Sequence, residues 1–288
     1  IRGGPGGGLH AAQTPADHRL EMHIHFLDPY RPGASPVHAL DPRVKLVLVL
    51  AFILTTSLTP MGAWPIYILL FSIALSVVIL SELGIGSVLK RANLALPFVL
   101  AALPLIFTAG APILFVIPLG FGTLEVSQEG VIRFASIAFK SWISVQMAIV
   151  LAATTRFPEL LTAMRALKVP RLLVAIFGLM WRYLFVLADE AMRLMRARAA
   201  RSGHPPTPGA KVGGTIPWRA RVTGGMAGNL FLRSFERGDR IYAAMSARGY
   251  DGEVRTFPLP KLAASQIIVL TFGLLLLLSL LALSLMFT

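Results

Sequence analysis

The chain has 288 residues, of which 55% are hydrophobic and only 14% are charged, and its formal net charge is +13. Its mean hydropathy of +0.70 lies outside the usual range of soluble globular proteins, so the composition predicts an integral membrane protein. The absence of cysteine excludes disulfides, thiolate metal sites and cysteine nucleophiles. Between Arg156 and Lys261 there are 18 Lys and Arg against 7 Asp and Glu, so 11 of the 13 net charges lie in one segment. This distribution favours a basic cytoplasmic domain between membrane spans over a nucleic-acid-binding protein.

Residues 1–36 are rich in Gly, Pro and His and contain no apolar run long enough to form a signal peptide. We expect them to form a disordered N-terminal tail. A metal site needs ligands held on rigid elements, so the histidines of this region do not predict one, although the pair at 23 and 25 is closely spaced. The histidines considered are His10, His18, His23, His25 and His38.

Apolar runs of about 20 residues can cross the ~30 Å hydrocarbon layer of a membrane. Four such helices are expected within residues 37–155 and a fifth within 261–288. The third run is interrupted by prolines and glycines, so we expect one span followed by an irregular re-entrant or surface segment. The five runs are 44–59, 62–80, 94–119, 131–155 and 261–287.

The distribution of basic residues predicts the orientation of the spans. Arg43 and Lys45 stand at the first span, Lys90 and Arg91 follow the second, and the basic segment 156–260 follows the fourth. Loops on the other side of the membrane would contain no Lys or Arg. Because basic loops stay on the cytoplasmic side, we expect a cytoplasmic N-terminus and an external C-terminus.

Two charged sites near the membrane have alternative interpretations. Lys140 lies within the fourth apolar run, where it either reaches outward to the external interface or contacts a transported substrate. Asp41 and Arg43 precede the first span, and a structural ion pair is favoured over a direct role in transport.

The basic segment 156–260 is expected to form a cytoplasmic domain with two long helices. The first helix is predicted over 170–202, apolar in its first half and charged in its second, with Asp189 and Arg193 spaced for an ion pair. The second is predicted from 218 or 223 to 247, with three glycines early in it that permit close approach of another helix. These glycines are Gly224, Gly225 and Gly228.

The second helix is strongly amphipathic by its sequence pattern. One face is expected to carry Arg233, Arg237, Arg240 and Arg248, and the other Phe231, Phe235, Tyr242 and Met245.

Each of the two helices ends in an arginine between small residues. An arginine in this position can enter a groove on a partner and make several fixed hydrogen bonds, which a lysine could not reproduce. The repetition of the pattern predicts two similar soluble partners. The two triplets are Ala200-Arg201-Ser202 and Ala247-Arg248-Gly249.

These features resemble the transmembrane T components of energy-coupling factor (ECF) transporters, most closely the CbiQ type of cobalt uptake systems. The resemblance covers about residues 26–288 and rests on the two triplets, the pattern of spans and two flanking motifs. The long tail before Met22 is a departure from the family pattern. The motifs are His38-Ala39-Leu40-Asp41-Pro42-Arg43-Val44-Lys45 and Arg248-Gly249-Tyr250-Asp251-Gly252.

The resemblance implies an all-α integral membrane protein with about five transmembrane helices and a cytoplasmic pair of long amphipathic coupling helices. Its partners would be two ABC-type ATPase subunits, which bind ATP and Mg²⁺, a CbiM-like substrate-capturing membrane subunit, and a further small membrane subunit. Arg201 and Arg248 would dock into the ATPases, with clearance given by the neighbouring small residues. Those neighbours are Ala200, Ser202, Ala247 and Gly249.

The sequence contains no phosphate loop, no His-Glu-x-x-His motif and no nucleophile accompanied by a base. We therefore expect a non-catalytic subunit with no cofactor of its own. The resemblance implies uptake of cobalt or nickel ions. The alternatives are the T component of a vitamin transporter, a conventional ABC permease, and a membrane enzyme acting on lipid phosphate.

Overall fold

The computed structural model describes residues 29–108, 113–119, 122–201, 215–251 and 261–286. The chain forms two compact units: residues up to 160 with those from 261 onward, and residues 161–260. The histidine pair at 23 and 25, most of the predicted disordered tail, and Ser202 lie outside the described residues.

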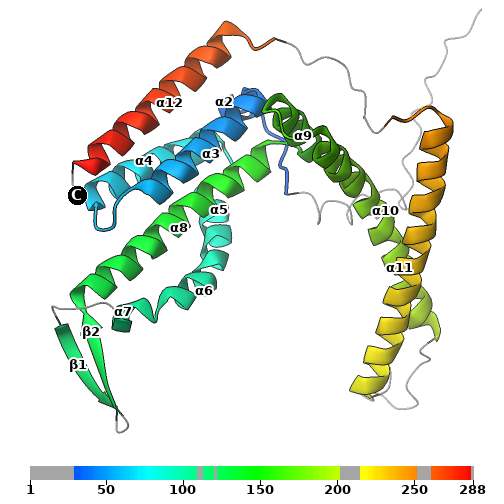
Figure 1. Ribbon diagram of the computed structural model, residues 1–288, viewed down its shortest axis with the longest axis horizontal. Coiled ribbons are helices and arrows are strands. Elements are labelled where there is room, and N and C mark those ends of the chain that lie inside the picture. The colour runs from blue at the N-terminus through cyan, green and yellow to red at the C-terminus, as the bar shows by residue number, and fades with distance from the viewer. Residues whose placement is uncertain (1–28, 109–112, 120–121, 202–214, 252–260, 287–288) are drawn as a thin grey trace, which may run out of the picture. The chain divides into compact units, whose positions relative to one another are not determined.

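Helices dominate both units (Figure 1). Helix α9 (Phe157–Ala166) crosses the boundary between the units, and the second unit contains α10 (Arg171–Arg201) and α11 (Ile216–Ala247). The other elements belong to the first unit: α2 (Pro36–Ala39), α3 (Pro42–Leu58), α4 (Trp64–Leu80), α5 (Ile85–Ala92), η1 (Asn93–Ala95), α6 (Leu96–Val99), η2 (Leu100–Ala102), α7 (Leu105–Thr108), β1 (Ile113–Leu119), β2 (Gly122–Ser127), α8 (Gln128–Thr154) and α12 (Ala264–Leu285).

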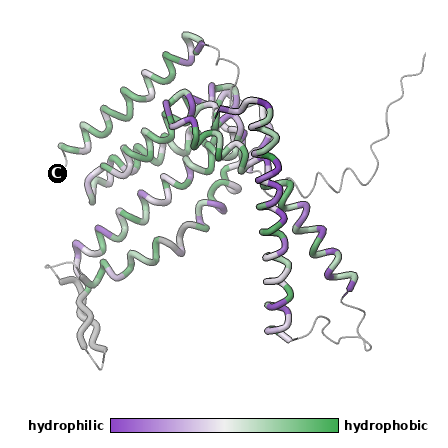
Figure 2. Tube along the Cα trace, turned by 45° about the vertical axis from the view of Figure 1, so that its right-hand side comes forward, coloured by the Kyte–Doolittle hydropathy of each residue, from purple (hydrophilic) through white to green (hydrophobic). Residues whose placement is uncertain are grey.

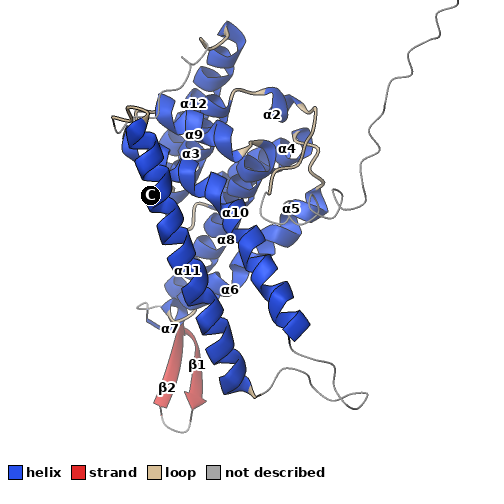
Figure 3. Cartoon of the chain, turned by 90° about the vertical axis from the view of Figure 1, so that its right-hand side faces the viewer, coloured by secondary structure: helices blue, strands red, loops and turns tan. Residues whose placement is uncertain are grey.

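A β-hairpin lies between α7 and α8, where the sequence analysis expected an irregular re-entrant or surface segment. Strands β1 and β2 pair in antiparallel register, with Ile117 opposite Leu124 and Leu119 opposite Gly122 (Figure 3). The run from Ile113 to Ile117 consists of β-branched, aromatic and leucine residues, most of which favour strands. Hydropathy alone does not separate such a run from a buried helix. Because this segment forms a regular β-hairpin, the expectation of irregular backbone was wrong here. The other described elements are helices, as in an all-α membrane protein.

The third apolar run, 94–119, contains no single helix long enough to span a membrane among its described residues, although one span was predicted in it. Its described part is divided among four short helical segments and β1. Pro97 and Pro104 lack the backbone N–H that a continuing helix needs, and their rings clash with the preceding turn. The total of five membrane spans therefore stays a prediction.

Three described helices are long and apolar enough to cross a membrane: α8, α10 and α12. Helix α4 is a shorter apolar helix of the same character, and α12, which ends beside the C mark in Figure 2, is mostly hydrophobic. Helices α8 and α12 correspond to predicted spans. Helix α10 is a further candidate by length and composition. It was not among the predicted spans, because its sequence lies in the basic segment expected in the cytoplasm.

The core of the first unit lies between α3, α4, α8 and α12. A second cluster joins the end of α4 and α5 to the last turns of α8. Within a membrane, such packing stabilises through van der Waals contact rather than through removal of apolar surface from water. Buried members of the first cluster are Phe52, Ile66, Leu70, Ile143 and Leu277.

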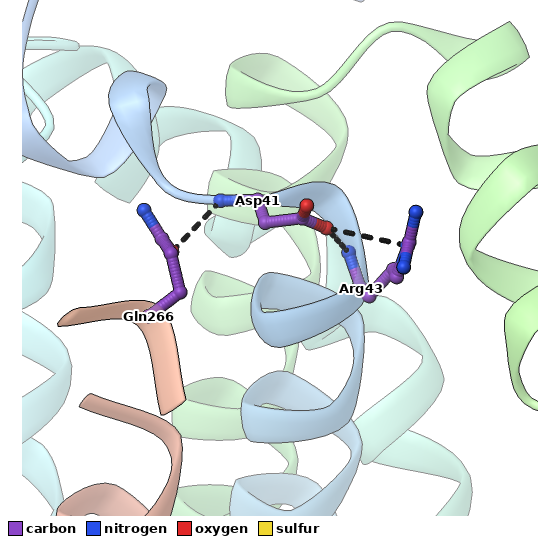
Figure 4. A network of polar contacts seen from close by, with 3 residues as sticks. All are labelled: Asp41, Arg43 and Gln266. Atoms are coloured by element: carbon purple, nitrogen blue, oxygen red, sulfur yellow. Dashed lines mark hydrogen bonds and ion pairs between the residues drawn. The ribbon is translucent and has the colours of Figure 1, made fainter. Parts of the chain in front are cut away.

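The start of α3 is fixed by a polar network around Asp41 (Figure 4). The Asp41 carboxylate accepts a hydrogen bond from the Arg43 backbone N–H at 2.9 Å, and Pro42 occupies the first turn, where no intrahelical N–H bond is needed. The same carboxylate lies 3.7 Å from the Arg43 guanidinium, so the predicted structural ion pair is confirmed. The Asp41 backbone N–H donates to the Gln266 side chain at 3.1 Å, which ties α3 to α12.

Lys45, near the start of α3, binds the end of α8. Its side chain is buried, and its Nζ donates to the backbone carbonyl of Thr154, the last residue of α8, at 3.1 Å and to that of His38 at 3.0 Å. The last carbonyls of a helix have no intrahelical partner, and they carry partial negative charge. Lys45 therefore satisfies an end of α8 that would otherwise be unpaired.

Lys140 of α8 makes the reciprocal contact. Its Nζ donates to the backbone carbonyls of Ser57 and Thr59 at the end of α3, and lies 5.7 Å from the Tyr67 ring centroid. Lys140 therefore stabilises the C-terminus of α3, a contact that neither interpretation of the sequence included.

Close approach of backbone occurs at Gly130, in the first turn of α8. A Cβ atom at this position would lie 2.6 Å from the carbonyl oxygen of Leu105 and 2.7 Å from that of Ile106. Glycine is therefore required for α7 to lie against α8.

We predict that Lys45→Met lowers the stability of the protein by about 1–3 kcal/mol, because methionine keeps the apolar stem but leaves the buried Thr154 carbonyl without a donor. The thermal midpoint in detergent micelles measures the effect. Lys90→Met, at an exposed lysine, is the control. Equal midpoints for the two variants would refute the structural role of Lys45.

Gly130→Ala should also destabilise the protein, by about 1–3 kcal/mol, because the new methyl group meets backbone atoms that cannot rotate away. The matched control is Gly86→Ala, where a Cβ meets no atom within 4 Å and the substitution should be neutral or slightly stabilising. The same melting assay distinguishes them, and an unchanged midpoint for Gly130→Ala would contradict the close approach.

Candidate functional site

Helices α10 and α11 are the two long helices predicted for the basic segment, and their bounds agree closely with the predicted 170–202 and 218 or 223 to 247. Two side-chain contacts join them. Arg233 donates to Glu190 at 2.8 Å, and Arg198 donates to the Thr223 hydroxyl at 3.0 Å. Because the later residue of α10 meets the earlier residue of α11, the two helices run antiparallel.

Glu190 is the acidic residue at this junction. Its side chain is only 15% exposed and also lies 3.5 Å from Arg193 on its own helix. The predicted ion pair of Asp189 with Arg193 is not formed. On a helix the residues three and four positions before Arg193 lie equally near it, and Arg193 pairs with Glu190, three positions before. Glu190 is also the acid that faces α11. Glu190 therefore holds basic residues from both helices.

Arg248 caps the C-terminus of α11 at a left-handed turn. The Gly249 N–H donates to the Ser246 carbonyl at 3.0 Å, and the Tyr250 N–H donates to the Met245 carbonyl at 3.1 Å. This is the Schellman arrangement, which requires a left-handed residue, and Gly249 has a φ of 78°. The small residue after Arg248 is thus needed for the backbone turn.

Arg201 is the last residue of α10 and is exposed. It borders a cavity of about 400 Å³ formed with the first half of α11, including Trp218, Gly225 and Met226. The small residue before it, Ala200, is also exposed.

The structure does not bring Arg201 and Arg248 together. Arg201 lies beside the first half of α11, whereas Arg248 ends that helix, and at 1.5 Å per residue the helix is about 45 Å long. Neither guanidinium has an ion-pair partner among the described residues. Each is therefore available at a separate end of the helix pair.

The face assignment for α11 needs one correction. Arg237 lines the same groove as Tyr242 and Met245, although the sequence pattern placed it on the opposite face. Arg237 and Ile241 are one turn apart, so the arginine lies at the border between the polar and apolar faces rather than at the centre of the polar one. Phe231 and Phe235 are both exposed.

The glycines early in α11 do not make the predicted close contact within the chain. A Cβ added at Gly224, Gly225 or Gly228 would meet no atom within 4 Å. Gly225 instead lines the cavity beside Arg201, where the lack of a side chain leaves open space.

Potential metal ligands do not gather in the described part of the chain: it contains no group of three or more His, Cys, Asp or Glu side chains. The one described histidine of the N-terminal set, His38, has both ring nitrogens in hydrogen-bonding contact. Nδ1 lies 2.6 Å from the Ser35 hydroxyl and Nε2 lies 3.1 Å from the Arg31 carbonyl.

Comparison with known proteins gives consistent relatives. The chain is 29% identical over 239 residues to the ECF transporter transmembrane protein EcfT of Lactococcus lactis subsp. cremoris, covering 77% of this chain and 83% of the relative. It is 30% identical over 170 residues to the cobalt transport protein CbiQ of Rhodobacter capsulatus, covering 59% and 65%. A protein of Methanocorpusculum labreanum named as a fused cobalt transport protein, CbiMQ, is 27% identical over 263 residues, covering 84% of this chain and 40% of the relative.

The family model for the cobalt transport protein CbiQ matches residues 33–258, which include both helices of the candidate site. Together with the apolar helices, this match identifies a multi-pass membrane protein and a transporter subunit. The chain therefore belongs to the CbiQ family and is a transmembrane T component of the ECF transporters.

Proposed function

We propose that the protein is the scaffold and energy-coupling subunit of an ATP-driven ECF uptake transporter for cobalt or nickel ions. Two ABC-type ATPase subunits, which bind ATP and Mg²⁺, would move α10 and α11, and the membrane helices would pass this movement to a CbiM-like subunit that captures the ion. In this scheme the chain has no catalytic residue and no cofactor of its own. A further small membrane subunit completes the proposed assembly.

The observation that carries the proposal is the placement of two exposed arginines, neither with an ion-pair partner among the described residues, at separate ends of an antiparallel helix pair. A guanidinium offers five N–H donors in a fixed fork, which suits docking into a groove lined by carboxylates or carbonyl oxygens. We assign Arg201 and Arg248 to the two ATPases. The small residues Ala200, Ser202, Ala247 and Gly249 beside them in the sequence are assigned to give clearance, and Gly249 also provides the backbone turn.

The relative named CbiMQ supports a CbiM-like partner. The similarity to this chain covers 40% of that fused protein, which leaves room in the same polypeptide for a CbiM-like part. A T component that is joined covalently to such a part in one organism is a reasonable partner for a separate one in another.

The proposed topology puts the N-terminus and residues 156–260 in the cytoplasm and the C-terminus outside. Lys and Arg near the start of α3, after α4 and throughout α10 and α11 are all cytoplasmic in this arrangement. The apolar first half of α10 would lie along the membrane surface, and its charged second half would extend away from it.

We predict that the double variant Arg201→Ala with Arg248→Ala loses the ATPases while remaining folded in the membrane. Truncating a buried, charge-assisted contact commonly costs 2–5 kcal/mol, so each site should weaken by about 30-fold or more. Co-purification of the ATPases with the tagged chain measures the loss. The control is Arg196→Ala with Arg221→Ala, which removes one exposed arginine from each helix away from its end. Full recovery of the ATPases with the first variant would refute the docking model.

Glu190→Gln should uncouple transport from ATP hydrolysis in the assembled complex. Loss of the carboxylate weakens the contacts with Arg193 and Arg233, so movement of one helix is transmitted less faithfully to the other. We expect cobalt uptake in vesicles to fall several-fold while ATPase activity persists. Glu236→Gln removes an exposed ion pair within α11 and should leave both activities unchanged. Parallel losses of uptake and hydrolysis in Glu190→Gln would argue against a coupling role.

A further inference from the structure

An apolar groove of about 760 Å³ runs between α10 and α11. Its walls come from the apolar first half of α10 and the last turns of α11. A cavity of this size and character falls in the range of small-molecule binding sites. Apolar groups that line it include Leu172, Leu179, Leu187, Ile241, Tyr242 and Met245.

One end of the groove adjoins a second, smaller cavity of about 260 Å³ that is lined by charged groups. The two cavities share Leu187, Ser234 and Arg237. The charged residues of the second cavity are four arginines and two glutamates, which leaves a net charge of +2. They are Arg193, Arg233, Arg237, Arg240, Glu190 and Glu236.

Arg237 is the arginine of this cluster that remains available. Glu190 forms ion pairs with Arg193 and Arg233, and Glu236 lies 4.0 Å from Arg240. Arg237 is half-buried and has no ion-pair or hydrogen-bond partner in the described part of the chain. A half-buried cation without a counter-ion, placed where an apolar groove begins, suits a ligand with one anionic and one apolar end.

We propose that this site binds an anionic phospholipid, with an acyl chain in the groove and the phosphate on Arg237. From Leu187 to Leu172 the α10 wall rises about 22 Å, which exceeds the ~15 Å depth of one leaflet's hydrocarbon and so accommodates an acyl chain. Asp251 lines the far end of the groove, so the anionic head group belongs at the Arg237 end. Basic pockets beside apolar helices are the expected recognition site for such lipids.

The lipid site is distinct from the proposed ATPase-docking residues. Neither Arg201 nor Arg248 lines the groove or the charged cavity. Loss of lipid binding and loss of ATPase docking can therefore be measured separately, and the lipid proposal does not depend on the proposed transport function.

The test is a titration of the delipidated full chain in neutral detergent with phosphatidylglycerol and, separately, phosphatidylcholine, with bound lipid counted by native mass spectrometry. Wild-type protein should bind phosphatidylglycerol at least fivefold more tightly. Arg237→Gln should remove about that factor and leave phosphatidylcholine unaffected, since one basic residue near a lipid surface supplies roughly a fivefold gain. The control Arg221→Gln removes an exposed arginine of α11 outside both cavities.

A second pair of variants tests the groove itself. Gly238 lines it, and a Cβ there meets no atom within 4 Å, so Gly238→Leu should fill space needed by the acyl chain without impairing the helix. We expect it to weaken binding of both lipids several-fold, whereas Gly224→Leu, in open space outside the groove, should not.

Three results would overturn the proposal. Equal losses in Arg221→Gln and Arg237→Gln would show diffuse attraction to the basic surface. Unchanged binding in Gly238→Leu would show that no acyl chain enters the groove. Displacement of phosphatidylglycerol when the partner ATPases or the capturing subunit bind would identify the groove as a protein interface.

Discussion

Two lysines join the two ends of α3 to α8: Lys45, near the start of α3, binds the carbonyl oxygen that ends α8, and Lys140, in the middle of α8, binds the carbonyl oxygens that end α3. A charged group within a membrane protein is expensive, and so is an unpaired backbone carbonyl. Here each lysine ammonium group donates to carbonyl oxygens at a helix end, so neither the charge nor these carbonyls are left without a partner. Lys45 and Lys140 hold α3 and α8 in register, and α4 and α12 pack against this pair in the core.

The second unit distributes its polar contacts differently. Glu190 and Arg198 join α10 to α11 within the helices, while the last residues of both helices have no side-chain ion pair among the described residues. Side-chain contacts thus join the two helices along their length, whereas the arginines at the two ends have no ion-pair partner among the described residues. This arrangement suits a part that transmits movement between partners, because the ends can be bound without first breaking an internal contact.

Much of this architecture could be predicted from local sequence pattern. The apolar runs gave α3, α4, α8 and α12, and the arginine triplets gave the ends of α10 and α11. The lysine contacts could not be predicted, because they depend on which helix ends meet, and sequence spacing does not contain that information. The β-hairpin differs from the prediction for another reason: the prolines and glycines of this run indicate irregular backbone, but Pro118 lies in an edge strand of a two-stranded sheet, where proline is tolerated. Gly249 was predicted to give Arg248 clearance, and the structure shows a further requirement at this position, a left-handed turn.

The Schellman turn at Gly249 links the Arg248 end of α11 to the apolar groove. The Tyr250 N–H and the Met245 carbonyl form the bond that closes this helix end, and the side chains of both residues line the groove. Arg248 lies between them in the chain and makes its own backbone bond to the Met245 carbonyl at 3.0 Å. Any molecule that packs against Met245 and Tyr250 therefore contacts residues of the same turn in which Arg248 lies. The Arg248 end of α11 and the apolar groove therefore share one set of backbone hydrogen bonds.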